Sequence, residues 1–351
     1  MKYPQSLRTN GRIGFVAPSF GCATEPYRSG FKNAQKKLGE LGYSLDLGFN
    51  CYEERGIGIS NTPKECAREL MAYYLSPEND VLISCGGGEL MCEILEYMDF
   101  ERLRTVAPKW FMGYSDNTNF TYLLTTLCDT ASIYGPCAAA FGMEPWHPAI
   151  EDALGILTGR VRQVTGYDKW EKEALKSEEN PLAPYHVTEE RNLKLWEPSS
   201  DGIISGLSGN ASAAFRGRLL GGCMDCLVTL LGTGFDRTAE FVERYKEDGI
   251  IWFLEACDIN VFSIRRAMWQ MEQAGWFRHV KGFLFGRPRA AEPMMGLDAY
   301  EAVLSTASRY HVPVAFDLDI GHLPPMMPLI VGSLAQVQIN GNHITIEMQE
   351  R

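Results

Sequence analysis

Short apolar runs alternate with amphipathic stretches from residue 12 to about residue 135. The amphipathic stretches near 27–41 and 89–98 have helical periodicity, and they separate apolar runs at 13–17, 81–84 and 110–112. This alternation is typical of a parallel sheet with helices on its faces. We therefore predict an α/β fold with an N-terminal parallel-sheet domain over residues 1–155.

The pattern changes in the second half of the chain. Polar residues interrupted by Pro and Gly predict a linker or lid over residues 156–215. A second set of apolar runs follows at 250–254, 282–285 and 312–316. A helical pattern lies between the first two of these runs. Asn340-Gly341 lies between two alternating segments and predicts a terminal β-hairpin. We therefore predict a second α/β domain over residues 216–351.

Composition narrows the class of protein. The chain has 351 residues, 45% of them hydrophobic and 22% charged, which indicates a globular protein longer than one core usually supports. The formal net charge of −11 argues against a nucleic-acid surface, since that surface would be basic. A small-molecule or peptide substrate is favoured.

The chain carries neither a signal-peptide pattern at its N-terminus nor an apolar run long enough to cross a bilayer. Its ten cysteines are scattered through apolar contexts, which predicts a reducing, cytoplasmic compartment. Cys223 and Cys226 form an isolated Cys-x-x-Cys in a helical setting, which favours core cysteines over a zinc or redox site. We predict no metal and no cofactor.

Ser115 is the candidate nucleophile. It follows a short apolar run and a Gly, and it precedes a helical pattern, as a nucleophile on a strand-to-helix turn does. Asn117 replaces the second Gly of Gly-x-Ser-x-Gly, and a Ser in this place can instead cap the following helix. The local pattern leaves both interpretations open.

A serine nucleophile needs a base, a carboxylate that orients the base, and oxyanion donors. Among six histidines, structural roles suffice for His147, His186, His279, His311 and His343, whereas His322 lies on a Gly-preceded, Pro-stiffened loop after an apolar run. Glu255 closes another apolar run and is a candidate carboxylate, with three competitors at Asp258, Asp317 and Asp319. The Gly86-Gly-Gly88 run lacks the Lys-Ser/Thr of a phosphate-binding loop, but its backbone N–H groups suit an oxyanion.

Taken together, several short motifs resemble a known family. They are Ile13-Gly-Phe-Val-Ala-Pro-Ser19, Ser84-Cys-Gly-Gly-Gly88, Gly113-Tyr-Ser-Asp116, Gly217-Arg-Leu-Leu-Gly-Gly222, Leu254-Glu255 and Gly321-His322. In order and spacing they look like the serine peptidases of the LD-carboxypeptidase family, which includes the microcin C immunity peptidases. The resemblance spans nearly the whole chain.

The resemblance implies roles for particular residues. Ser115 would be the nucleophile, His322 the general base and acid, and Glu255 the carboxylate that orients His322. The backbone N–H groups of Gly88 and Asp116 would form the oxyanion hole. The resemblance also implies a C-terminal domain with small β-barrel character and a homodimer with the site in the groove between the domains.

Two departures from the family bear on the substrate. Cys223 stands where many members carry Asn, and the segment 160–210 is long. Both features look more like the microcin-immunity branch, in which an aromatic residue of this segment binds substrate. Trp196 or Trp170 could have that role in this chain. The expected substrate is a small peptide or peptide-nucleotide, cleaved either at the L-to-D amide of a murein tetrapeptide or at the link to a nucleotide-like group. An α/β-hydrolase-like esterase and a non-catalytic ligand-binding protein are the alternatives.

Overall fold

The computed structural model describes residues 1–198 and 211–351. The chain divides into two compact units that are not contiguous in sequence. The first unit comprises Met1–Arg162, Glu173–His186 and Pro328–Ile330, and the second comprises Gln163–Lys172, Val187–Met327 and Val331–Arg351. The segment 156–215 therefore contributes to both units.

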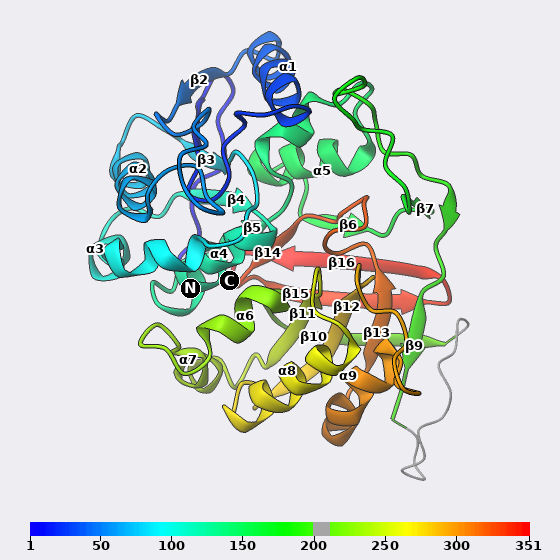
Figure 1. Ribbon diagram of the computed structural model, residues 1–351. Helices are drawn as coiled ribbons and strands as arrows, with labels where there is room; N and C mark the ends of the chain where they lie inside the picture. Colours follow the sequence, from blue (N-terminus) through cyan, green and yellow to red (C-terminus); the bar gives the residue numbers. More distant parts are fainter. Residues whose placement is uncertain (199–210) are drawn as a thin grey trace. The chain divides into compact units, whose positions relative to one another are not determined.

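The first unit is built on a six-stranded sheet (Figure 1). Four successive pairings, between β1 and β2, β1 and β3, β3 and β4, and β4 and β5, are parallel. The strand order is β14 (Leu329–Val331), β5 (Ser132–Tyr134), β4 (Trp110–Gly113), β3 (Val81–Ser84), β1 (Arg12–Val16) and β2 (Ser44–Leu47). The predicted parallel α/β sheet is confirmed.

Helices and short 3-10 turns connect these strands. Apolar residues three to four positions apart bury one face of α1 at Phe31, Ala34 and Leu38. At α2, the Thr62 side chain accepts a hydrogen bond from the backbone of Glu65, and Pro63 opens the first turn. The helices are α1 (Tyr27–Glu40), α2 (Pro63–Leu75), α3 (Phe100–Thr105), α4 (Thr118–Thr126) and α5 (Pro148–Leu157), and the 3-10 turns span Met91–Tyr97, Ser115–Asn117 and Ala138–Gly142.

The second unit contains an eight-stranded mixed sheet. The pairings of β10 with β11, β11 with β12 and β12 with β13 are parallel, and the remaining four are antiparallel. The strand order is β6 (Gln163–Thr165), β16 (His343–Gln349), β15 (Leu334–Asn340), β10 (Ser212–Cys223), β11 (Ile250–Glu255), β12 (Val280–Gly286), β13 (Val314–Leu318) and β9 (Lys194–Trp196). The predicted second α/β region and its terminal hairpin, where Asn340 pairs with His343, are confirmed.

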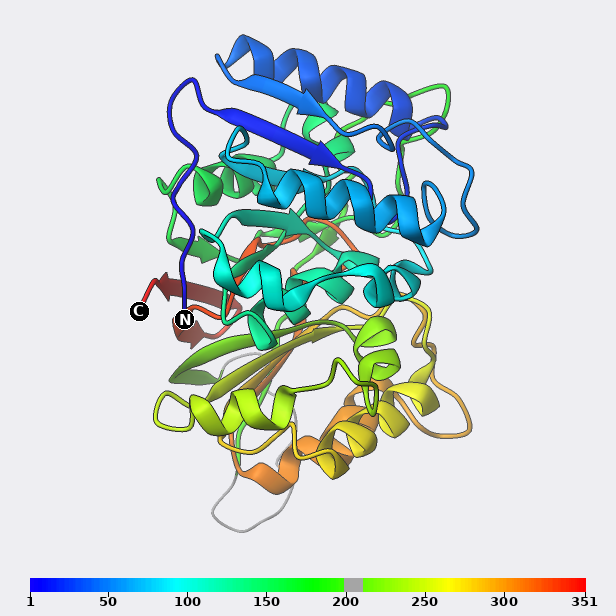
Figure 2. The same cartoon turned by 90° about the vertical axis from the view of Figure 1, so that its left-hand side faces the viewer.

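In the part of this unit that the structure describes, the sheet is accompanied by the helices α6 (Met224–Leu230), α7 (Thr238–Arg244), α8 (Val261–Gln273) and α9 (Ala299–Ala307). Figure 2 shows α8 and α9 side by side, in yellow and orange. α8 is the helix predicted between the runs at 250–254 and 282–285, and its apolar residues Ile264, Ala267, Met268 and Met271 are buried. A 3-10 turn spans Ser308–Tyr310, and β7 (Lys169–Trp170) pairs with β8 (Glu189–Glu190) in a small separate sheet.

The cysteine side chains are all free thiols. Eight of the ten are buried, as expected of small core residues. Among the helices that the structure describes, none combines the length and the apolar character needed to cross a membrane.

Candidate functional site

Ser115 occupies a strained turn at the carboxyl end of β4. Its φ angle is +62°, a region that costs energy for a residue with a side chain. The N-cap position of α4 belongs to Asn117, so Ser115 does not cap that helix. A partly exposed Ser held in this conformation between a strand and a helix has the local geometry of a nucleophile.

The glycine-rich loop after β3 lies against Ser115. A Cβ atom placed on Gly87 would be 3.1 Å from Cβ and 3.2 Å from Oγ of Ser115. Asn117 Nδ2 donates a hydrogen bond to the carbonyl oxygen of Gly86 at 2.8 Å and so ties the loop to the turn. Gly113 is required here, because a Cβ atom would come within 2.8 Å of the Asn117 side chain.

Asp116 anchors the other side of the turn. Its buried Oδ2 accepts hydrogen bonds from Ser19 Oγ at 2.5 Å and from the backbone N–H of Met91 at 2.9 Å. Burial raises the pKa of Asp116 to about 6, although these hydrogen bonds oppose the shift. Gly88 also adjoins Ser19, whose hydroxyl occupies the space that a Cβ of Gly88 would need. The oxyanion role of the Gly88 and Asp116 backbones stays a prediction.

Glu255 and His322 meet in the second unit. His322 Nδ1 lies 2.9 Å from Glu255 Oε2, and the side chains are 13% and 0% exposed. Burial lowers the pKa of His322, but the charge of Glu255 and hydrogen bonds with the Cys257 and Glu255 side chains outweigh burial and raise it. The pair is therefore an imidazole oriented by a carboxylate in a dry environment, the arrangement that supports a general base.

Gly321 allows this contact. Its φ angle is +99°, and a Cβ atom at this position would lie 2.6 Å from Glu255 Oε2. Any side chain would therefore both strain the backbone and displace the carboxylate. The Gly that precedes His322 is the feature of the sequence that brings the loop down onto Glu255.

The other acidic candidates have different partners. Asp319 pairs with Arg287, Asp317 accepts a hydrogen bond from Tyr300, and Asp258 lies at the surface 3.7 Å from Arg289. Of the four carboxylates considered, Glu255 is the one that the structure places against His322.

Arg287 holds the loop that carries His322, and sequence reasoning missed it. Its guanidinium donates hydrogen bonds to Asp319 Oδ1 at 2.5 Å and to the carbonyl oxygen of Asp317 at 2.8 Å, with Trp170 5.0 Å away as a cation–π partner. Both side chains of the Arg287 and Asp319 ion pair are at most 6% exposed. A charged residue directly after the apolar strand β12 was the available clue.

Replacing Arg287 by Met is expected to lower the free energy of unfolding by about 3–5 kcal/mol, because the buried Asp319 loses the cation that pairs with it. Chemical denaturation checks this value. The double variant Arg287→Met/Asp319→Leu is expected to recover part of the loss. Arg309→Met is the matched control, since its pair with Glu272 is at the surface and costs at most about 1 kcal/mol. Equal losses at both arginines would contradict the prediction.

Cys223 is a second residue whose place sequence reasoning missed. It is buried, as predicted for a core cysteine, but it is the register partner of Glu255 across β10 and β11. One ligand atom each from Cys223, Glu255 and His322 lies within 4.8 Å of the other two. A hydrogen bond with Cys226, burial and the charge of Glu255 raise the pKa of the Cys223 thiol.

The two candidate aromatic residues lie in the second unit. Trp196 is 3% exposed in strand β9, where it pairs with Val314 of β13. Trp170 faces the guanidinium of Arg287. Nothing in these contacts tests a role in substrate binding, so that role stays a prediction for both.

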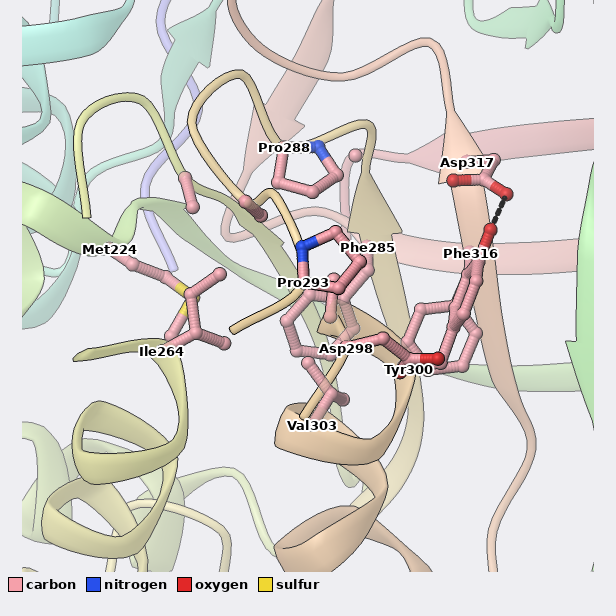
Figure 3. Close-up of a pocket in the computed structure, with 14 residues that line it drawn as sticks. Met224, Ile264, Phe285, Pro288, Pro293, Asp298, Tyr300, Val303, Phe316 and Asp317 are labelled. Carbon is pink, nitrogen blue, oxygen red and sulfur yellow. Dashed lines mark hydrogen bonds between the residues drawn. The ribbon is translucent and has the colours of Figure 1, made fainter. Parts of the chain in front are cut away.

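A mostly apolar pocket of about 210 Å³ lies beside the end of β11 (Figure 3). The rings of Phe285 and Phe316 line it, and Tyr300 Oη donates a hydrogen bond to Asp317 Oδ2 at 2.6 Å in its wall. Ala256, which follows Glu255 in the chain, is also part of the lining. The pocket has the size and character to accept one apolar side chain or ring.

Comparison with known proteins assigns the chain to a family. Residues 13–135 match the model of the LD-carboxypeptidase N-terminal domain, and residues 216–337 match that of the C-terminal domain. The chain belongs to the LD-carboxypeptidase family. This family assignment identifies the chain as a carboxypeptidase.

Three similar proteins illustrate the range of the family. A Bacillus subtilis protein named "Probable murein peptide carboxypeptidase" is 22% identical over 98% of this chain and 94% of its own length. The microcin C7 immunity protein MccF, solved with glutamyl sulfamoyl guanosine, is 22% identical with a TM-score of 0.79 over 99% of this chain and 98% of its own. A muramoyltetrapeptide carboxypeptidase from Oxalobacter formigenes is 19% identical with a TM-score of 0.70, over 97% and 99%. At these identities the two solved structures show the shared fold.

Proposed function

We propose that this LD-carboxypeptidase family member is a serine peptidase that hydrolyses an amide bond through Ser115, His322 and Glu255. The observation that carries the proposal is the buried hydrogen bond between His322 Nδ1 and Glu255 Oε2. A carboxylate in this position fixes the imidazole tautomer and stabilises the imidazolium that forms during acyl transfer. The strained turn at Ser115 supplies a hydroxyl with the local geometry of a nucleophile.

The reaction proceeds through an acyl-enzyme. Ser115 Oγ attacks the carbonyl carbon of the scissile amide and transfers its proton to His322 Nε2, because Nδ1 is engaged with Glu255. The imidazolium then protonates the leaving nitrogen, and the C–N bond breaks. Water then attacks the ester carbonyl in the same way, which releases the product carboxylic acid and restores the Ser115 hydroxyl. The mechanism requires Ser115 Oγ and His322 Nε2 to come within hydrogen-bond reach in the substrate complex.

The oxyanion of each tetrahedral intermediate is assigned to the backbone N–H groups of Gly88 and Asp116. Both residues border the turn that holds Ser115, since Ser19 contacts each of them. Loss of one such donor costs about 3 kcal/mol of transition-state stabilisation. The buried Asp116 carboxylate supports this role by fixing the turn rather than by reacting.

Two substrate classes fit a carboxypeptidase of this family, a murein tetrapeptide and an amino acid linked to a nucleotide-like group. The deciding experiment is incubation of the purified protein with each, followed by mass spectrometry of the products. Release of a terminal D-amino acid assigns the first class, and release of the amino acid from an aminoacyl sulfamoyl nucleoside assigns the second. Cleavage of neither would contradict both assignments.

An esterase and a binding protein are the two alternatives to a peptidase. Ester hydrolysis without amide hydrolysis would favour the first. The second predicts substrate binding without turnover and without labelling of Ser115 by a fluorophosphonate. We propose the peptidase because burying the carboxylate–imidazole pair costs desolvation free energy, and a protein that only binds its ligand does not need such a pair.

We also propose that the protein acts as a homodimer in the cytoplasm. The resemblance to the family supports the dimer, and ten free thiols suit a reducing compartment. Light scattering coupled to size-exclusion chromatography tests the oligomeric state, and a mass of one chain would contradict it.

A further inference from the structure

We propose that Cys223, Glu255 and His322 bind a thiophilic divalent cation, Zn²⁺ above all, and that this binding inhibits the peptidase. Binding of the ion is inferred from the geometry of the second unit alone. Inhibition by the bound ion rests on the proposed function. One ligand atom from each residue lies within 4.8 Å of the other two. All three residues are contributed by ends of neighbouring strands or by the loop after β13.

The strand register builds the site. Cys223 and Glu255 are direct partners across the parallel strands β10 and β11, so their side chains emerge on the same face. Gly321 lets the loop after β13 bring His322 against Glu255. The positions of the three donors are thus set by the backbone of the sheet, which lowers the entropic cost of collecting them around an ion.

The distances suit zinc after a small adjustment. Zinc binds sulfur at about 2.3 Å and nitrogen or oxygen at about 2.0–2.2 Å, so the donors of a tetrahedral site lie about 3.2–3.6 Å apart. His322 Nδ1 and Glu255 Oε2 are 2.9 Å apart and would open slightly, while the thiolate, which lies within 4.8 Å of both other ligand atoms, would approach by less than about 2 Å. The side chains of both strand-end ligands are buried, whereas His322 is 13% exposed and gives the ion access.

The donor set selects the ion. A thiolate, an imidazole and a carboxylate together favour Zn²⁺ and disfavour Mg²⁺ and Ca²⁺, which prefer oxygen ligands. Binding displaces the proton of the Cys223 thiol to solvent, and the imidazole must be neutral. No electron transfer is involved.

Inhibition follows from the chemistry of the imidazole. If the ion takes Nδ1, the proton moves to Nε2, which then cannot accept the proton of a nucleophile. If it takes Nε2, the basic lone pair is occupied. In either case the ion also removes Glu255 from the imidazole, so the general base is lost.

Cobalt tests binding independently of activity. Titration of the protein with Co²⁺, with the cysteine thiols kept reduced by a phosphine, is expected to give a thiolate-to-cobalt absorption band in the near ultraviolet, saturating at one ion per chain. Cys223→Ser is expected to lose the band and at least about 10–100-fold in affinity, since even an outer-shell partner is worth that much. Cys226→Ser is the matched control, because Cys226 contributes no ligand atom to the cluster and a serine hydroxyl can keep its hydrogen bond with Cys223. Glu255→Gln is expected to weaken binding without abolishing the band.

Inhibition is measured on each variant relative to its own activity without metal. Zn²⁺ is expected to inhibit the wild-type protein and Cys226→Ser reversibly, with recovery on chelation, and to inhibit Cys223→Ser only at 10–100-fold higher concentration. Absence of the band in a folded wild-type protein, or its loss in Cys226→Ser alone, overturns the site. A band without inhibition overturns the inhibitory role. A band in a protein that cleaves no peptide supports the site while refuting the proposed function.

Discussion

Replacing Ser115 by Ala is expected to reduce kcat by about 10⁴- to 10⁶-fold, because the proposed reaction has no other nucleophile. The change removes a single oxygen from a partly exposed side chain, and Ala tolerates the same backbone strain about as well as Ser. We therefore expect an unchanged midpoint of denaturation. Steady-state turnover of whichever amide substrate is cleaved provides the measurement.

The matched control is Ser132→Ala, on the neighbouring strand β5 of the same sheet. Its hydroxyl is buried and donates to the carbonyl oxygen of Thr121 at 2.8 Å, so its loss costs about 1 kcal/mol of stability and leaves turnover within a few-fold of wild type. Substrate affinity measured by calorimetry is expected to survive in Ser115→Ala. Turnover close to wild type in Ser115→Ala would refute the nucleophile.

The effects of Ser115→Ala and His322→Ala are not expected to add. A base without a nucleophile has nothing to deprotonate, so the double variant should be no slower than the slower single variant. Multiplicative losses would mean that the two residues act in separate steps.

The fold could be predicted from the sequence where local patterns decide it. Alternating apolar runs and helical stretches gave the parallel sheet of the first unit, and Asn340-Gly341 gave the terminal hairpin. The division of segment 156–215 between the two units could not be predicted from local patterns. It depends on which strands its short pieces join, such as β6 beside β16 and β9 beside β13.

The candidate site also has features that the local sequence pattern predicts and one that it does not. Gly113 and Gly321 mark their turns in the sequence, because each stands where a side chain would collide with a neighbour. Glu255 could not be separated from Asp317 and Asp319 by local pattern, because each ends or follows a strand. Only the contact with His322 distinguishes it.

Long-range pairings explain what was missed. Arg287 and Asp319 are 32 positions apart, and nothing local to either predicts that they pair in the interior. Cys223 looked like a core cysteine, and it is buried as one, but the register of β10 against β11 places it beside Glu255. The same burial describes a packing residue and a ligand, so burial alone cannot tell them apart.

Replacing Glu255 by Gln is expected to reduce kcat by about 10⁴-fold while leaving the shape of the site nearly unchanged. The amide is isosteric with the carboxylate but no longer stabilises the imidazolium, and it can present its N–H₂ group to Nδ1 and so favour the wrong tautomer. Gln fills the same buried volume as Glu255, so the fold is expected to be retained, although the stabilisation of protonated His322 by the carboxylate is lost.

The pH profile distinguishes this role from a merely structural one. In the wild-type protein the pKa of His322 is raised, so kcat/KM falls as the pH decreases through that raised value and the base becomes protonated. Without the negative charge of Glu255 the pKa of His322 falls, and the acid limb of the residual activity moves to lower pH. Asp258→Asn is the control, since Asp258 lies three residues further along at the surface and should change neither the rate nor the profile. An acid limb that stays in place in Glu255→Gln would show that this carboxylate does not set the basicity of the catalytic imidazole.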